Sequence, residues 1–155
     1  EVDLSVTLTE LNPFDFFLDP YANAYPFVYS ASDQQTLAPY LAVAESSDRG
    51  SRFMGLVREL NQPAPDTVQF LIAVNLRIAC TIRYVVRHEA GVQTPEQSLL
   101  LGSGSCRDSA WLLVQLFRSL GLAARFVSGY LIDVLAPAPA ATTQTKKRPR
   151  SRRPL

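Results

Sequence analysis

Histidine and cysteine are scarce in this 155-residue sequence, and their scarcity excludes several kinds of site. A single histidine, His88, makes a histidine-based zinc site implausible. The two cysteines, Cys80 and Cys106, lack the C-x-x-C spacing of metal clusters and are too few for a disulfide framework. We therefore expect two reduced thiols, no metal and no cofactor.

Long apolar runs are missing as well. No segment approaches the roughly 18 to 20 consecutive apolar residues of a transmembrane helix, and no basic and then apolar leader opens the chain. We expect a cytoplasmic protein without membrane contact. Residues 2–8 alternate apolar and polar side chains, which predicts a half-buried strand. The chain begins without methionine inside this pattern, so we expect it to be a fragment.

Lysine is confined to a basic tail. Six lysines and arginines lie within residues 146–155, whereas the rest of the chain has nine arginines against fourteen acidic residues. Residues 135–155 are rich in proline and alanine and then basic, a composition that cannot fill a core, so we predict disorder there. One use for the six cations is weak contact with nucleic acid. A solvated end without a role is the alternative.

Proline and the aromatic residues crowd together in residues 12–29, which rules out a long helix there. We expect these aromatic side chains to pack against a neighbouring element, with a ligand platform as the alternative. Farther along, apolar spacing predicts helices from Asp33 to Asn61 with an interruption at Pro39. Asp66 is the expected N-cap of the longest helix. The expected apolar stripe of that helix is Leu71, Val74, Ile78, Ile82 and Val85.

Two further helices are predicted around a loop of glycine and serine. Thr94 and Gln97 form a capping box for a short helix that Gly102 ends, and a short strand is expected between the longest helix and Gly91. The second helix begins near Cys106 and ends at Gly121. We expect its buried face to consist of Ala110, Leu113, Val114 and Phe117, and we expect "ARFVSGYLI" to follow as a strand.

Cys106 is the candidate catalytic residue, because a thiol on the first turn of a helix meets unpaired N–H groups and the positive end of the helix dipole. The glycines let a substrate approach closely, and the backbone N–H of Cys106 is available to a developing oxyanion. These features suit acyl transfer. The competing interpretation is a buried structural cysteine, which is how we interpret Cys80 on the longest helix. Asp108 either caps the new helix or orients Arg107.

Residues 94–131, "TPEQSLLLGSGSCRDSAWLLVQLFRSLGLAARFVSGYL", strongly resemble the nucleophile region of bacterial transglutaminase-like proteins. Residues 11–29 look like the end of the β-rich amino-terminal region of these proteins, and the resemblance covers roughly residues 1–132. It implies an α+β fold with a papain-like core, in which Cys106 opens the central helix beside an antiparallel sheet. It also implies a protein or peptide substrate, attacked at a glutamine side chain or a peptide bond.

The sequence departs from this family after Cys106. The family places its catalytic histidine downstream in a His-Ala-Trp block, followed by an aspartate, and this chain has no histidine after Cys106. His88 lies upstream in a polar patch, so we interpret it as a surface residue. Trp111 is expected in the core, with a wall of the substrate groove as the alternative. General-base assistance is worth about 10² to 10⁴-fold in rate, so we predict that this chain lacks enzymatic activity.

The resulting division has three parts. Residues 1–31 are the end of a β-rich region, residues 32–134 a partial transglutaminase-like core with an incomplete antiparallel sheet, and residues 135–155 the tail. We interpret the chain as truncated after the strand that follows the nucleophile helix. Two alternatives stay open: a non-catalytic module that binds protein or nucleic acid, and a tail that is translated out of frame.

Overall fold

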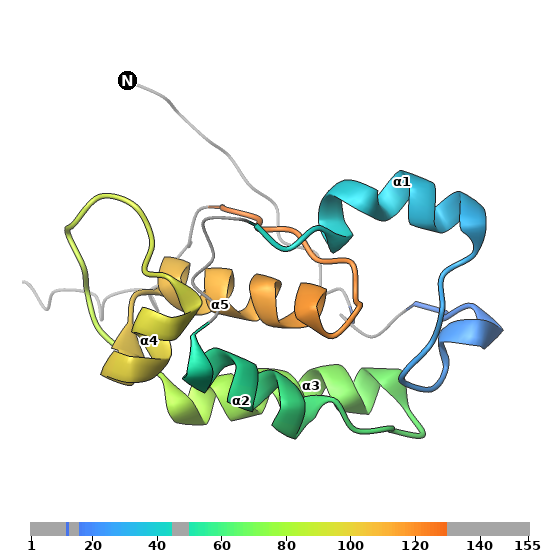
Figure 1. Ribbon diagram of the computed structural model, residues 1–155, viewed down its shortest axis with the longest axis horizontal. Helices are drawn as coiled ribbons and strands as arrows, with labels where there is room; N and C mark the ends of the chain where they lie inside the picture. Colours follow the sequence, from blue (N-terminus) through green and yellow to red (C-terminus); the bar gives the residue numbers. More distant parts are fainter. Residues whose placement is uncertain (1–11, 13–15, 45–49, 130–155) are drawn as a thin grey trace, which may run out of the picture.

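The helices gather around α5, which runs through the middle of the molecule (Figure 1). The computed structural model describes residues 12, 16–44 and 50–129. The expected strand at residues 2–8 and the tail at 135–155 lie outside these ranges. Within them the elements are η1 (Pro20–Ala22), α1 (Ala31–Leu41), α2 (Ser51–Leu60), α3 (Thr67–Thr81), β1 (Arg83–Tyr84), α4 (Pro95–Leu101), β2 (Ser103–Gly104) and α5 (Cys106–Ser119).

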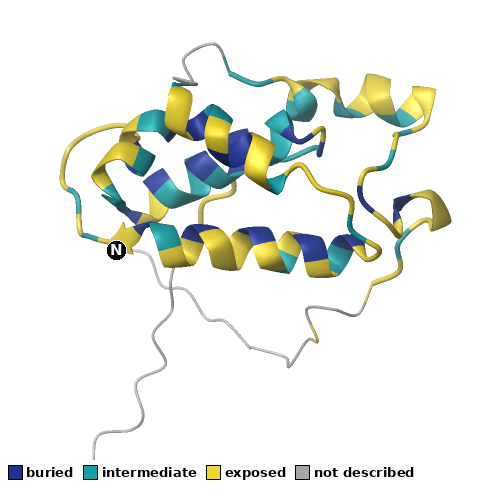
Figure 2. Ribbon diagram, turned by 60° about the horizontal axis from the view of Figure 1, so that its bottom comes forward, coloured by how far each residue is buried: buried dark blue, intermediate teal, exposed yellow. Residues whose placement is uncertain are grey.

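The core lies where α2, α3 and α5 meet. Each of these helices has its buried residues on the side that faces the others, and Figure 2 shows the outer sides of the same helices exposed. Phe53 of α2 and Leu112 and Leu116 of α5 are completely buried. Burial of one such side chain stabilises the fold by about 1.5 to 3 kcal/mol, and these three belong to one core cluster that joins α2, α3 and α5.

The apolar stripe of α3 begins one residue earlier than predicted. Val74, Ile78 and Ile82 are buried as expected, but Leu71 is exposed and Phe70 takes its place. Phe70 is four residues before Val74, so the two lie on the same side of the helix. Cys80 is exposed. The prediction that this thiol lies in the core is therefore wrong, because its face of α3 points away from α2 and α5.

The buried face of α5 also differs from the prediction. Val114 is buried as expected, whereas Ala110, Leu113 and Phe117 are half-buried. The fully buried positions include Leu112, Leu116 and Gln115. The reason is that α5 contacts all four other helices. A helix that is covered on several sides does not need the single apolar stripe on which the prediction rested.

Pro39 does not interrupt α1, contrary to the prediction. It lies inside the helix, which continues to Leu41 and starts at the N-cap Ser30. Proline removes the hydrogen bond to the carbonyl four residues earlier. Because Pro39 lies in the last turn of α1, only that one bond is lost, and the helix ends soon afterwards.

The sheet is small and parallel. Arg83 pairs with Ser103, and Tyr84 pairs with Gly104. The short strand expected before Gly91 is therefore present, but the expected antiparallel sheet is not found among the described residues, whose antiparallel pairing is an isolated bridge between Tyr25 and Ala64. The chain passes from β1 to β2 through α4, and a crossover of this kind makes the two strands parallel. The strand predicted for "ARFVSGYLI" is also absent in its described part, residues 124–129, because no neighbouring strand pairs with it there.

Tyr25 anchors the aromatic segment to the core, which confirms the expected packing for this residue. It is 3% exposed, and its ring stacks on Phe70 with ring centroids 4.0 Å apart. Its hydroxyl lies 2.9 Å from Asn61 Oδ1 and 3.1 Å from the Leu120 carbonyl, within donating distance of both. Burial raises the pKa of this phenol. Phe17, in contrast, is fully exposed.

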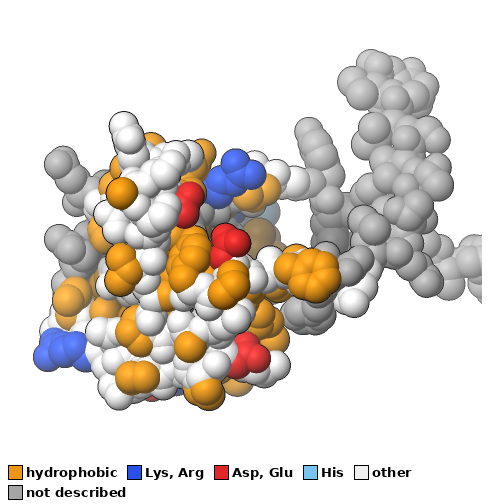
Figure 3. Space-filling model, turned by 90° about the vertical axis from the view of Figure 1, so that its right-hand side faces the viewer, with side chains coloured by type: hydrophobic (Ala, Val, Ile, Leu, Met, Phe, Trp, Pro, Cys, Tyr) orange, Lys and Arg blue, Asp and Glu red, His pale blue; other side chains and the backbone are white. Residues whose placement is uncertain are grey.

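Hydrophobic side chains are common on the surface at the α1 end of the molecule, where Figure 3 shows few charged groups between them. Apolar side chains are also exposed in other parts of the described ranges, for example Tyr84, Val86, Leu100 and Val127. None of the helices described is both long enough and apolar enough to cross a bilayer.

Candidate functional site

Cys106 is the first residue of α5, and its thiol is exposed and unpaired. It lies at a surface groove of about 540 Å³ between α3 and α5, here named the Cys106 groove. The groove combines apolar side chains with a few polar ones. Its lining consists of Asn75, Ile78, Ala79, Ile82, Arg83, Tyr84, Cys106, Ser109, Ala110 and Leu113. The alternative of Cys106 as a buried core residue is therefore wrong.

The loop before Cys106 connects the end of α4 to the start of α5, and each of its residues has a defined position in that connection. Gly102 ends α4 in the left-handed region with φ of 59°, which glycine adopts without a steric penalty. The next two residues form β2 beside β1, and Ser105 is the N-cap of α5. The chain thus turns from α4 into the sheet and straight into α5, so that Cys106 emerges on the first helical turn.

The carboxylate of Asp108 fixes this loop through hydrogen bonds. One carboxylate oxygen accepts hydrogen bonds from the backbone N–H and the hydroxyl of Ser105, both at 2.7 Å. A capping box has two reciprocal hydrogen bonds, and the bond from the Ser105 N–H to Asp108 is the one that the side chain of the third helical residue accepts. The other oxygen accepts from the backbone N–H of Gln93 at 2.7 Å. Ser105 is therefore the N-cap, and Asp108 takes part in capping as the third helical residue of the capping box.

Arg87, which the sequence did not single out, is the ionic partner of Asp108. Its Nη1 donates to Asp108 Oδ1 at 2.6 Å, and the Asp108 side chain is completely buried. Burial alone would raise the pKa of this carboxyl. The hydrogen bonds from Arg87, Gln93 and Ser105 outweigh burial and hold the pKa well below its ordinary range. Arg107 is exposed, so the alternative in which Asp108 orients Arg107 is replaced by the pair with Arg87.

The space between the loop and Asp108 is filled. A Cβ atom added to Gly104 would lie 2.9 Å from Asp108 Cβ and 3.2 Å from Gln93 Oε1. Gln93 Oε1 in turn accepts a hydrogen bond from the buried hydroxyl of Ser98 at 3.0 Å. Gly104 is thus required for the loop to approach the carboxylate closely, which no helix or strand pattern in the sequence reveals.

His88 does not join Cys106. It is exposed, which confirms its interpretation as a surface residue, and it does not line the Cys106 groove. Trp111 is half-buried and is not among the residues that line the groove. Of the residues that the sequence suggested for chemistry, Cys106 lines the groove and His88, Trp111 and Asp108 do not.

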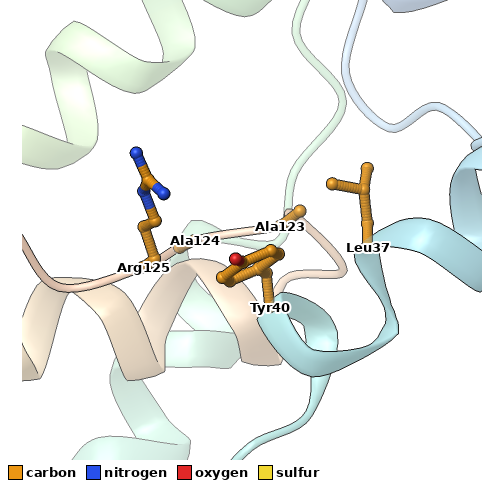
Figure 4. Close-up of a pocket in the computed structure, with 5 residues that line it drawn as sticks. All are labelled: Leu37, Tyr40, Ala123, Ala124 and Arg125. Atoms are coloured by element: carbon orange, nitrogen blue, oxygen red, sulfur yellow. The ribbon is translucent and has the colours of Figure 1, made fainter.

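A second hollow of about 310 Å³ lies between α1 and the segment that follows α5. Figure 4 shows Leu37 and Tyr40 of α1 next to Ala123, Ala124 and Arg125. None of these residues is a nucleophilic thiol. Across the described ranges, no three His, Cys, Asp or Glu side chains are grouped so as to hold a metal ion.

Comparison with known proteins gives one match. A family model described as the transglutaminase-like superfamily covers residues 55–146, more than half of the 155-residue chain. No curated protein and no solved structure matches the chain. The matched range includes α3, α4, the Gly/Ser loop and α5, and thus the whole environment of Cys106 described above. The chain belongs to the transglutaminase-like superfamily.

Proposed function

We propose that Cys106 is the nucleophile of a thiol acyl transfer reaction on a protein or peptide substrate. The observation that carries this proposal is the position of Cys106. It is exposed on the first turn of α5, and it lines the Cys106 groove. A buried carboxylate fixes the loop in front of it. We also propose that the core is papain-like, with α5 as its central helix.

The proposed reaction has two steps. The Cys106 thiolate attacks the carbonyl carbon of a glutamine side chain or a peptide bond, a C–S bond forms, and the amine leaves with a proton. Water or an acceptor amine then attacks the thioester and releases the thiolate. The free N–H groups on the first turn of α5, including that of Cys106, are suited to stabilise the oxyanion of each tetrahedral intermediate.

Both steps require a proton donor and acceptor, and this chain has one histidine, which is exposed and outside the Cys106 groove. We therefore propose that the 155-residue chain by itself is acylated at Cys106 by a substrate but does not complete repeated catalytic cycles. A general base is worth about 10² to 10⁴-fold in rate. A thiol tolerates its loss better than a hydroxyl, because a few per cent is ionised at neutral pH without help.

Acylation by p-nitrophenyl acetate tests the proposal. The thiolate displaces p-nitrophenolate, so each acylated thiol adds one acetyl group to the mass of the protein and releases one coloured product. The two cysteines provide matched controls, since both thiols are exposed. We expect Cys80→Ser to be acylated about tenfold faster than Cys106→Ser, because the N–H groups on the first turn of α5 can stabilise an oxyanion at Cys106, whereas Cys80 lies near the end of α3.

After the first equivalent, release of p-nitrophenolate should fall to the rate of spontaneous thioester hydrolysis. Equal acylation of the two single-cysteine variants would contradict the nucleophile assignment. Continued turnover that depends on Cys106, either here or in an amine-donor assay, would contradict the proposed lack of activity.

A further inference from the structure

A buried negative charge lies on the same helical turn as the proposed nucleophile. Asp108 follows Cys106 by two residues on the first turn of α5, and its side chain is completely buried. A carboxylate near a thiol disfavours the thiolate, because the two anions repel each other. An uncompensated Asp108 would therefore oppose the form of Cys106 that reacts.

The loop nevertheless needs an anion at this position. Asp108 accepts from two backbone N–H groups, those of Gln93 and Ser105, and from the Ser105 hydroxyl. An ionised carboxylate is an acceptor only, whereas an amide would present its own donors to some of these groups. The carboxylate shapes the loop that delivers Cys106, and its charge is unfavourable for the chemistry of Cys106.

Arg87 resolves this conflict. Its guanidinium lies 2.6 Å from Asp108 Oδ1 and is itself largely buried, with 17% of its side chain exposed. We infer that Arg87 is a positioning residue that neutralises Asp108, so that the carboxylate can cap the loop without disfavouring the Cys106 thiolate. This inference rests on the proposed role of Cys106 as a nucleophile.

Other charged and titratable groups surround the site. Arg83 and Tyr84 line the Cys106 groove from β1, and Arg107 follows Cys106 in the chain. Glu89 lies 3.5 Å from Arg87 Nε and is 72% exposed, so solvent screens its charge. None of the residues that line the groove is a carboxylate. These groups stay constant while Arg87 and Asp108 are changed.

The test is the pH dependence of Cys106 alkylation by iodoacetamide, followed by mass spectrometry. It uses the full 155-residue chain with Cys80→Ser as the parent, which leaves a single thiol. The variants are Arg87→Met, Asp108→Asn, the double variant and Arg87→Lys. Arg87→Met leaves a net negative charge, so the midpoint of the rate curve should rise by about 0.5 to 1 pH unit.

Asp108→Asn leaves a net positive charge, so its midpoint should fall by a similar amount. The double variant restores neutrality and should return close to the parent. Arg87→Lys keeps the charge and should also stay close to it. Damage to the loop would move both single variants in the same direction, so opposite shifts are the signature of charge compensation.

Shifts of the same sign, or unchanged midpoints in both single variants, would overturn the inference. Thermal melting by circular dichroism shows which variants are folded. If Arg87→Met does not fold, the double variant is compared with Asp108→Asn instead. These two proteins also differ only by the Arg87 charge, so the midpoint of the rate curve must be higher in the double variant. Alkylation by iodoacetamide does not require acyl transfer. If the alkylation midpoints shift as expected but Cys106 does not react with p-nitrophenyl acetate, the proposed function is rejected and the inference about Arg87 stands. Acylation with flat alkylation curves would reject the inference alone.

Discussion

At the scale of single residues, Asp108 links three parts of the site. It caps α5, it holds the N–H of Gln93 on the segment before α4, and it pairs with Arg87 after β1. These segments are up to 21 residues apart in the chain. One carboxylate therefore joins the start of the nucleophile helix to two points of the segment between β1 and α4.

The stability contributed by Asp108 should depend on pH. Its pKa is lowered in the folded state, so its contribution is complete above the ordinary pKa of about 3.9 and is lost as the pH falls below that value. We expect the free energy of unfolding of the parent, relative to Asp108→Asn, to decrease by about 1 kcal/mol between pH 6 and pH 3. Urea unfolding at the two pH values measures this difference. A constant difference would show that the carboxyl is not held ionised by the fold.

At the scale of elements, α4 supplies the cap that α2 lacks. The N-cap of α2 is Gly50, which has no side chain to accept a hydrogen bond. The carboxylate of Glu96 on α4 accepts instead from the backbone N–H groups of Arg52 at 3.2 Å and Phe53 at 2.8 Å. A negative charge at this end of α2 also interacts favourably with the helix dipole. The two helices are thereby joined through one side chain.

Replacement of Glu96 should loosen α2. We expect Glu96→Ala to lower the free energy of unfolding by about 1 to 2 kcal/mol, the usual cost of a lost N-cap. Glu59→Ala is the matched control, because Glu59 makes an exposed ion pair with Arg77 at 3.1 Å. An exposed pair is worth about 0 to 1 kcal/mol. Urea denaturation measures the free energy of unfolding of both variants. An equal decrease in the two variants would disprove the capping role of Glu96.

The elements that the sequence predicted best are those with local signals. Asp66 caps α3, Thr94 and Gln97 form the capping box of α4, and Gly121 follows the end of α5 with φ of 79°. Each of these features depends on residues a few positions apart. The prediction for the buried face of α5 failed because helices distant in the sequence cover α5 on several sides. The predicted interruption at Pro39 failed for a local reason, since this residue lies in the last turn of α1.

The candidate site divides in the same way. The position of Cys106 on the first turn of a helix follows from the Gly/Ser loop and the apolar run behind it. Arg87 could not be found by spacing, because it lies 21 residues before Asp108. The available signal was chemical: an aspartate that is buried at a cap calls for a cation.

At the scale of the whole molecule, α5 contacts α1, α2, α3 and α4 and so joins these described helices into one unit. Its side chains also hold segments that have no regular structure. Gln115 accepts from the Ala44 N–H at 3.1 Å, and Arg118 donates to the carbonyls of Ala42 at 2.7 Å and Ala124 at 2.9 Å. One helix therefore holds both the other helices and the irregular segments between them.

The basic tail is the basis of the alternative proposal, a non-catalytic module that binds protein or nucleic acid. If residues 146–155 bind nucleic acid, affinity for a duplex DNA oligonucleotide should fall steeply between 50 and 200 mM salt, by about 10³-fold for six phosphate contacts. Deletion of these ten residues should abolish binding. Fluorescence anisotropy with the full and shortened chains measures both. Binding that survives the deletion, or that ignores salt, would reject this use of the tail.

The bonds between the two ends of the described chain have a consequence for synthesis. The hydroxyl of Tyr25 lies against the carbonyl of Leu120, 95 residues later, and the Tyr29 hydroxyl accepts from the Ala123 N–H, 94 residues later. At about 5 to 20 residues per second, a ribosome needs about 5 to 20 s to add such a stretch. During that interval the apolar sides of α2 and α3 have no α5 to cover them. The nascent chain is therefore exposed to aggregation until its central helix leaves the exit tunnel.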